Sequence, residues 1–342
     1  MLSSSNLTVV MHDWYARARA FAPGHITGFV EFPTLMLDDP LLKGSRGAGV
    51  CISKGVTTEV HIHPYPCDDA DANYVNTSAA EVSISINGKP CNDADVSLYV
   101  VNEYLRLVDW HRLKIDVMHK TDIPIGYGLG SSGAAALSLS YALNKALMLN
   151  LSDEEAARIA HKADLACRCG AGTVIAEYHG GLEMRFKAGA PGIGVVENIK
   201  YRLDDYSVLV LCISPYSTKE FLTNRIGMIN GLGGKMLNVL KDSRSVDTFL
   251  DLSFRFAKSI GFITERVARV IDALHGIGCK ASVALFGETV FTIVRDDKVE
   301  DVKSLLACYR DLYSSPTSQC HLLSCSIDTR GARVLDYTRE PS

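Results

Sequence analysis

A glycine-rich stretch that runs directly into a helix is the feature that most restricts how this chain folds. Residues 124–133, PIGYGLGSSG, contain four glycines and two serines, and an alanine-rich apolar run follows them without a break. Before them, LKIDVMH alternates apolar and polar side chains, which predicts a strand. The helical pattern extends from Gly133 to Leu149, and Asn150 is typical of a helix end. The sequence therefore predicts a strand, a flexible loop and a helix in succession.

Such a loop is suited to binding an anion. Glycines let the backbone fold closely around a ligand, and the first amides of a helix are unpaired and lie at the positive end of its dipole. A phosphate group is the ligand that this arrangement predicts. The loop is not a P-loop, because no lysine follows it, and a dinucleotide-binding fingerprint is also disfavoured. The alternative is a glycine turn that merely lets a helix pack closely on a sheet.

The rest of the chain predicts an α+β protein. Ser152 and Glu155 have the spacing of a capping box, which opens a second helix that ends near Cys167. Beyond residue 205 the pattern changes to a buried strand, helical segments to about His275, two adjacent strands, a helix and a closing strand. The four strand segments are DYSVLVLCIS, SVALFG, TVFTIV and HLLSCSID.

A chain of 342 residues is long enough for two domains. We predict that residues 1–204 form a domain that carries the glycine loop and that residues 205–342 form a smaller α+β domain.

Composition favours a protein that acts on a small molecule. Hydrophobic residues make up 47% of the chain and charged residues 22%, and the formal net charge of −4 argues against nucleic acid or an anionic membrane as partner. No apolar run approaches the roughly 20 residues of a membrane-spanning helix, and the first residues lack the apolar core of a signal peptide. We therefore expect a cytoplasmic protein.

The ten cysteines do not indicate a disulfide framework or a zinc site. Cys167 and Cys169 lack the spacing of a zinc knuckle, and His61 and His63 have no second ligand pair nearby. We expect reduced thiols and no structural metal, and we expect the Asp- and Asn-rich residues 67–78 to form a surface loop.

Three motifs carry a resemblance to a known family. The stretch from Gly126 to Ala134 resembles the phosphate loop of the GHMP kinases, which include galactokinase, homoserine kinase and mevalonate kinase. FAPGHITGFVE, from Phe21, resembles the first motif of the family, and GCKASVALFGETVFTIV, from Gly278, resembles its third. Within the family, APGHITG and residues 161–192 most resemble the archaeal pantoate kinases, which phosphorylate pantoate on the route to coenzyme A.

This resemblance implies a two-domain GHMP kinase fold. Its N-terminal domain would be like domain 2 of ribosomal protein S5, and its C-terminal domain would be ferredoxin-like. ATP and the acceptor would bind in the cleft between the two domains, and the loop would wrap the phosphates. The implied cofactor-binding residues are Pro124, Gly126, Gly128, Leu129, Gly130, Ser131, Ser132 and Gly133.

The resemblance also implies a Mg²⁺ site. The Ser132 hydroxyl would touch the ion, and Asp164 stands where the family usually has a metal-binding glutamate. A hydroxyl, a carboxylate and phosphate oxygens suit Mg²⁺, which needs no dedicated protein cage. The alternative for Asp164 is a solvated charge on a helix face.

One position departs from the family pattern. Where an aspartate often follows a G-L-G element as candidate base, this chain has Thr173 after Gly170-Ala171-Gly172. Threonine does not take a proton as a carboxylate does, but phosphoryl transfer depends mainly on positioning and charge neutralisation. We therefore still predict activity, with Ser132, Asp164 and Thr173 as the catalytic candidates.

Polar residues of the first and third motifs are expected near the acceptor. A small hydroxy acid such as pantoate needs one cation for its carboxylate, for which Arg185 and Lys219 are candidates, arginine being favoured for its bidentate fork. The alternative for His25 is a buried histidine with a structural role. The alternative for Arg185 and Lys219 is that both are surface charges. The full set of predicted acceptor-side residues is His25, Thr27, Gly28, Arg185 and Ser282, with Gly287 and Thr289 closing the other side, where Gly287 has the alternative of a turn glycine.

Three functions remain open from the sequence. The first is an ATP-dependent kinase that acts on pantoate. The second is a kinase of the same fold with another acceptor, such as mevalonate, phosphomevalonate or homoserine. The third is a catalytically silent nucleotide-binding protein, which Thr173 makes conceivable. The oligomeric state also stays open, a homodimer being one option.

Overall fold

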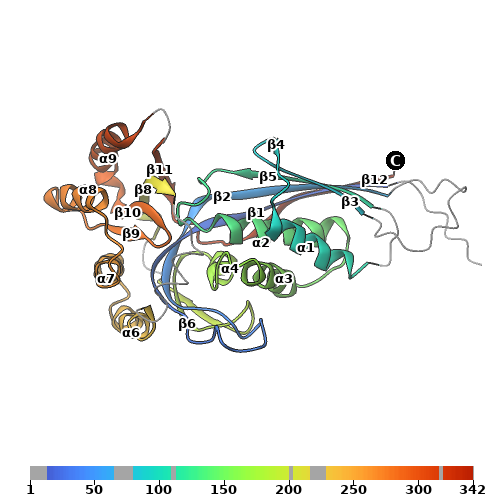
Figure 1. The fold of residues 1–342 in the computed structure, drawn as a ribbon, viewed down its shortest axis with the longest axis horizontal. Coiled ribbons are helices and arrows are strands. Elements are labelled where there is room, and N and C mark those ends of the chain that lie inside the picture. The colour runs from blue at the N-terminus through green and yellow to red at the C-terminus, as the bar shows by residue number, and fades with distance from the viewer. Residues whose placement is uncertain are drawn as a thin grey trace, which may run out of the picture.

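The structure is a computed structural model. It describes residues 14–64, 80–108, 113–199, 203–215, 229–315 and 319–341. The segment 67–78 and Lys219 lie outside these ranges. The elements are arranged around two sheets, one large and one small (Figure 1).

The larger sheet has eight strands among the described residues, and its main path runs β12-β1-β2-β5-β3-β4, with β6 pairing to β2 and β7 to β6. Only β3 and β5 pair in parallel. The strands are β1 (Trp14–Glu31), β2 (Arg46–Pro64), β3 (Ala80–Ile86), β4 (Lys89–Pro90), β5 (Leu113–Thr121), β6 (Leu182–Lys187), β7 (Val195–Asn198) and β12 (Arg333–Pro341).

Four helices cover one face of this sheet (Figure 1). Alternate residues of β1, such as Ala16 and Ala18, are fully buried beneath them, while Arg17 and Arg19 point to the opposite face. Small residues on both surfaces let the alanine-rich α2 lie close to the strands. The helices are α1 (Asp95–Leu105), α2 (Ser131–Ala146), α3 (Asp153–Ala166) and α4 (Thr173–His179).

The smaller sheet has the order β11-β8-β10-β9. Strands and helices follow one another as β-α-β-β-α-β, the order of ferredoxin-like folds, with several helices in the first connection. The elements are η2 (Leu203–Asp205), β8 (Tyr206–Pro215), α6 (Gly233–Ser243), α7 (Val246–Ser259), α8 (Glu265–Gly276), β9 (Ser282–Ala284), β10 (Gly287–Arg295), η3 (Asp296–Lys298), α9 (Val299–Tyr313) and β11 (His321–Ser326).

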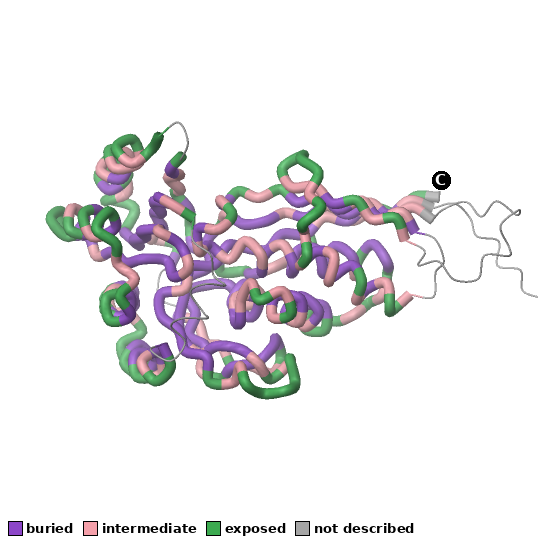
Figure 2. Tube along the Cα trace, in the orientation of Figure 1, coloured by how far each residue is buried: buried purple, intermediate pink, exposed green. Residues whose placement is uncertain are grey.

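One hydrophobic core joins the two sheets. It packs Phe29 of β1 against Phe249 and Phe256 of α7, and Phe249 in turn against Phe291 of β10, with ring centroids 6.1 to 6.5 Å apart. Figure 2 shows buried residues along the helix-covered side of the large sheet and again where the sheets meet. The two sheets therefore share packed side chains at the end of the molecule where α2 begins.

Most of the predicted elements are present. The capping box of Ser152 and Glu155 opens α3, and β5, α2, β8, β9, β10, α9 and β11 lie where the sequence predicts them, within a few residues. Strands β1 to β4, β6, β7 and β12 and helices α1 and α4 were not predicted. Because β12 pairs with β1, residues 333–341 belong to the larger sheet, whereas the predicted second domain included them. The boundary at residue 205 itself stays a prediction.

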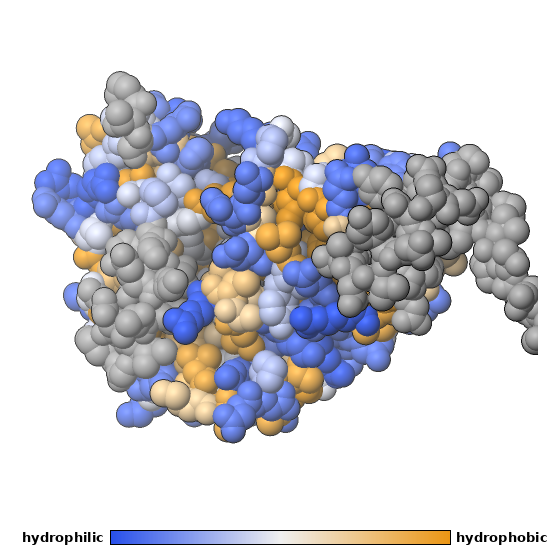
Figure 3. Space-filling model, turned by 45° about the vertical axis from the view of Figure 1, so that its right-hand side comes forward, coloured by the Kyte–Doolittle hydropathy of each residue, from blue (hydrophilic) through white to orange (hydrophobic). Residues whose placement is uncertain are grey.

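Among the described residues, no helix is long and apolar enough to cross a bilayer. On the face that Figure 3 shows, apolar surface near the middle is bordered by hydrophilic regions. The nine described cysteines are free thiols, and the described ranges contain no group of three or more metal-ligating side chains.

Candidate functional site

The three sequence motifs meet at the glycine loop. The backbone amide of His25, in the first motif, donates to the carbonyl of Leu129 at 2.9 Å. In the third motif, a Cβ added at Gly287 would overlap the carbonyl of Tyr127, so this glycine permits a close approach of the β10 strand to the loop. Gly287 therefore takes part in this close contact, which the alternative of a simple turn glycine did not include. Segments far apart in the sequence thus hold the loop from two sides.

The loop ends at the N-terminus of α2 with unpaired amides. Gly130 caps the helix in the left-handed conformation, with φ of +74°, and no side chain caps the first turn. Ser131 and Ser132 open the helix. Free amides at the positive end of a sixteen-residue helix are suited to binding an anion.

A cavity of about 250 Å³ opens on one side of this helix terminus. Ser131, Ser132 and Ala135 of α2 form part of its wall, and most of the remainder is apolar or comes from the start of α1. The other lining residues are Val56, Ile86, Cys91, Asp93, Ala94, Asp95, Val96, Ser97, His119, Thr121, Ile125, Cys167 and Cys169. A flat, mostly apolar organic group with an attached anion fits such a cavity.

A second, smaller pocket of about 40 Å³ includes polar groups from the first motif and from the segment before α4. Thr27, Thr173 and Arg185 line it, together with Cys169, which also lines the larger cavity. The remaining lining residues are Val30, Phe32, Ser45, Gly170, Ala171, Gly172 and Phe286. Two pockets of different character therefore adjoin at Cys169.

Arg185 is the cation of the smaller pocket, and it is almost completely buried, with 1% of its surface exposed. Its Nη1 forms an ion pair with Glu183, which also accepts a hydrogen bond at 3.0 Å from His25 Nε2. Burial lowers the pKa of His25, so the ring is neutral and its Nδ1 can accept from the Thr27 hydroxyl, 3.4 Å away. The Nε of Arg185 has no partner among the described residues.

Two buried carboxyl groups lie near the start of α2. Asp164 of α3 is 2% exposed, and burial raises its pKa to about 7. A Cβ at Gly170 would touch this carboxyl, so the loop before α4 folds directly over it. Glu177 of α4 is fully buried, and burial and the nearby Asp164 raise its pKa well above the usual range. Neither oxygen of Glu177 has a hydrogen-bond partner among the described residues.

Comparisons with known proteins identify the family. Residues 96–181 match the family model of the GHMP kinases N terminal domain. A pantoate kinase of Methanocaldococcus jannaschii is 34% identical over 84% of this chain and 96% of its own length, and one of Thermococcus kodakarensis is 32% identical over 84% and 91%. The chain belongs to the GHMP kinase family. A solved structure titled as a phosphotransferase related to the CoA biosynthesis pathway is similar with a TM-score of 0.78 and 28% identity, covering 93% of this chain and 98% of its own.

The α+β GHMP kinase fold predicted from the sequence is thus confirmed, and this GHMP kinase is a small-molecule kinase that uses ATP. The structure brings Ser131, Ser132, Thr27, Thr173 and Arg185 to the two pockets, and the roles predicted for them stay predictions. Asp164 and Arg185 are buried, so the alternative of surface charges is wrong for both.

Other predicted residues occupy different places in this GHMP kinase. His25 does not line the smaller pocket and is the buried, hydrogen-bonded histidine of its alternative, acting through Thr27 and Glu183. Gly28 packs against Phe249 and Ser253 of α7, because β1 crosses that helix without room for a Cβ. Ser282 and Thr289 are buried in the small sheet and line neither pocket.

The remaining loop residues line neither of the two pockets. Leu129 is 1% exposed, and its side chain belongs to the core. The glycines at 126, 128, 130 and 133 and Pro124 line neither pocket with a side chain. Gly128 has φ of +74°, and a Cβ there would overlap the carbonyl of Leu285, so only glycine fits.

Sequence reasoning missed several residues of the site. Glu177 lies in AEYH, a stretch with no motif, and α4 is too short to show periodicity. His119 and Ser97, which line the larger cavity, were not singled out either; they hydrogen-bond each other at 2.9 Å, and burial lowers the pKa of His119 to about 4. The alternation of β5 places His119 on its inner side, which was the available signal.

Proposed function

We propose that this GHMP kinase transfers the terminal phosphate of ATP to the hydroxyl of pantoate, giving 4-phosphopantoate for coenzyme A synthesis. The buried guanidinium of Arg185 in the smaller pocket is the observation that carries the choice of acceptor. An unpaired Nε on a buried cation suits a substrate carboxylate, because a charge-assisted hydrogen bond would satisfy it. The similarity to two pantoate kinases over most of the chain supports the same acceptor.

The nucleotide would occupy the larger cavity. Its base and sugar would lie among the apolar residues beside α1, and its phosphates would approach the amides that follow Gly130. The cavity reaches Ser131 and Ser132 at the first turn of α2, which supports this placement.

The residues present fit a Mg²⁺ ion. Ser132 lines the larger cavity, and the Asp164 carboxyl lies buried nearby with no cation beside it among the ion pairs of the described residues. These two oxygens would hold the ion together with phosphate oxygens. When bound, Mg²⁺ would neutralise the charge of the phosphates.

The acceptor would lie in the smaller pocket, with its carboxylate on Arg185 and its hydroxyl toward Thr173 and the start of α2. Glu183 and His25 hold Arg185 and Thr27 from behind, so the pocket is organised before the substrate binds. In the transfer, a bond forms between the acceptor oxygen and the terminal phosphorus, and the bond from that phosphorus to the bridging oxygen of ADP breaks.

An acceptor panel tests this function. The purified chain is incubated with Mg-ATP and pantoate, mevalonate, phosphomevalonate or homoserine, and ADP release is followed by a coupled assay. We expect ADP release with pantoate and a phosphate monoester in the product by ³¹P NMR. Turnover of another acceptor alone would move the assignment to that substrate, and ATP binding without any turnover would support a silent homologue. A cytoplasmic location and a homodimer stay predictions.

A further inference from the structure

Glu177 is the acidic side chain that the mechanism so far leaves unused. It lies four residues after Thr173 on α4, so both side chains occupy the same face of the helix. Position 173 is where the family often has an aspartate, and here it carries a hydroxyl. The carboxyl group on this face of α4 is therefore displaced by one helical turn.

The geometry places this carboxyl beside the phosphate loop and beside Thr173. The position of a Cβ on Gly130 lies 2.6 Å from Glu177 Oε1 and 2.9 Å from the Thr173 methyl group. The equivalent position on Gly133 lies 2.8 Å from Glu177 Oε2 and 3.3 Å from Thr173 Cβ. Since both side chains approach the same two points, Thr173 and Glu177 are neighbours beneath the first turn of α2.

Packing alone does not account for a carboxyl group at this place. Glu177 is fully buried, and neither oxygen has a hydrogen-bond partner among the described residues. Burial of a polar group without a partner costs free energy that an apolar side chain of similar size would not lose. The other buried acid nearby, Asp164, adds repulsion between the two carboxyl groups when both are charged. Burial raises the pKa of Glu177, so its ionised form is a stronger base than an exposed carboxylate and, between the phosphate loop and the acceptor pocket, is suited to accept a proton.

We propose that Glu177 takes the place of the aspartate absent at position 173 and receives, through the Thr173 hydroxyl, the proton that the acceptor alcohol loses. This inference rests on the proposed phosphoryl transfer but not on the identity of the acceptor. As the acceptor oxygen bonds to phosphorus, its proton passes to Thr173 Oγ1, and the Thr173 hydroxyl proton passes to the Glu177 carboxylate. The electron pair of the broken bond leaves with ADP, and the proton returns to solvent after product release.

Thr173 is suited to this relay because it lies between the smaller pocket and the buried Glu177. It lines the smaller pocket and is only half-buried, whereas Glu177 has no contact with solvent. Its methyl group faces the loop, and rotation about χ1 to the other rotamer that threonine adopts in a helix would bring the hydroxyl to the place that the methyl group now holds. Thr173 would thus touch the acceptor, and Glu177 would act through it.

Two nearly isosteric variants test the relay. Glu177→Gln keeps the volume of the side chain but cannot take the proton, and Thr173→Val keeps the shape but removes the hydroxyl. For each we expect kcat to fall about 10²- to 10⁴-fold, with KM for ATP within about threefold of the native value. The double variant is expected to lose no more than either single variant, because both interrupt one path.

Restoring the acid where the family often has it gives the sharpest result. Thr173→Asp in the native background is expected to bring no gain, because it adds a third carboxyl group to the site. In the Glu177→Gln background the same change is expected to raise kcat at least tenfold above that of Glu177→Gln. A purely structural role of Glu177 would not produce this rescue.

Thermal unfolding and ATP binding by calorimetry accompany each variant. Glu177→Gln with native kcat would overturn the relay, as would loss of ATP binding, which would place Glu177 in phosphate binding instead. Absence of rescue by Thr173→Asp in a folded, ATP-binding protein would also overturn it. Failure of the proposed acceptor is recognised separately, because the ratios between variants are measured with whichever acceptor the native chain turns over.

Discussion

Charged side chains are arranged in opposite ways at the two pockets and on the outer face of the large sheet. Near the start of α2, Asp164, Glu177 and Arg185 are buried, and atoms of Glu177 and Arg185 lack partners among the described residues. On the outer face, charges are partly exposed and joined to one another. Unsatisfied buried charge costs stability, whereas paired surface charge contributes little either way.

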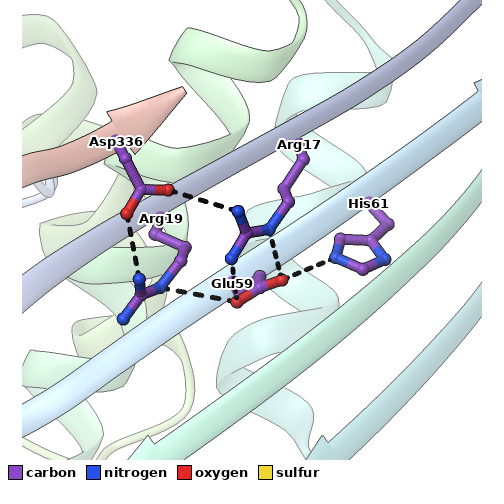
Figure 4. Close-up of polar contacts among 5 residues, drawn as sticks. All are labelled: Arg17, Arg19, Glu59, His61 and Asp336. Atoms are coloured by element: carbon purple, nitrogen blue, oxygen red, sulfur yellow. Dashed lines mark hydrogen bonds and ion pairs between the residues drawn. The ribbon is translucent and has the colours of Figure 1, made fainter. Parts of the chain in front are cut away.

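The outer-face network, defined by Arg17, Arg19, Glu59, His61 and Asp336, spans three strands (Figure 4). Glu59 of β2 accepts from Arg17 Nε at 2.6 Å and from His61 at 2.7 Å, and Arg19 Nη1 lies 2.9 Å from Asp336 of β12. This network serves the sheet, and substitutions there should affect stability and leave catalysis unchanged. Substitutions among the buried charges should lower catalytic activity.

The largest expected effect is that of Gly130→Val. A valine at φ of +74° is strained, and its side chain would enter the space held by Glu177 and Thr173, within 3 Å of both. We expect loss of ATP binding and at least a 10³-fold loss of turnover, measured by calorimetry and ADP release. Gly278→Val is the matched control, because Gly278 has φ of +75° with open space around it. Equal ATP affinity in both variants would refute a phosphate loop.

Arg185→Lys should separate acceptor binding from ATP binding. Lysine keeps the charge beside Glu183 but loses the fork that binds a carboxylate in two places. We expect KM for pantoate to rise about 10- to 100-fold with little change in KM for ATP, measured by steady-state kinetics. Arg244→Lys, in an exposed pair with Glu197, is the control and should behave as the native chain. An unchanged KM for pantoate would show that Arg185 does not bind the acceptor.

Asp164→Asn should reduce activity about tenfold at low Mg²⁺, with partial recovery when Mg²⁺ is raised. The amide keeps the shape but loses the charge that would attract the ion. The measurement is a Mg²⁺ titration of the rate, compared with Asp272→Asn on the exposed surface of α8. A native Mg²⁺ dependence in Asp164→Asn would assign this carboxyl a structural role.

The smallest effect is expected for Glu59→Gln on the outer face. Pairing with Arg17 lowers the pKa of Glu59 to about 2, from an ordinary value of 4.5. Its carboxylate therefore stabilises the folded state above about pH 4.5, and this contribution is lost as the pH falls toward 2. We expect Glu59→Gln to lower the free energy of unfolding by about 1 kcal/mol at pH 7, with the difference vanishing near pH 2 and kcat unchanged. Urea unfolding at both pH values measures this, and a constant difference would exclude the ionised pair as its source.

The parts of the fold that follow from local patterns were predictable. Alternation revealed β5, the run at Tyr206 revealed β8, and Ser152 with Glu155 marked the start of α3. The motif glycines marked the loop before α2, because backbone segments approach each other there so closely that only a residue without a side chain fits.

What the sequence did not reveal depends on contacts between distant segments. The burial of His25 against Glu183 and the packing of Gly28 on α7 depend on how β1 crosses β6 and the small sheet's helices, which no local pattern records. The position of Glu177 beside the loop depends on how α4 packs against the start of α2, which its local sequence does not show. Thr173, in contrast, could be singled out from the sequence, because it stands where the family often has an aspartate. Its neighbour Glu177 matches no motif.

The return of β12 to the edge of β1 has a consequence for synthesis on the ribosome. β1 is made before the smaller sheet, but its partner on that side, β12, is made only after the whole of that sheet. Until then β1 is an open sheet edge, with unpaired amides and carbonyls available to other chains. A nascent chain of this protein therefore exposes this edge until residues 333–341 are made, and shortening it at residue 332 would make that exposure permanent.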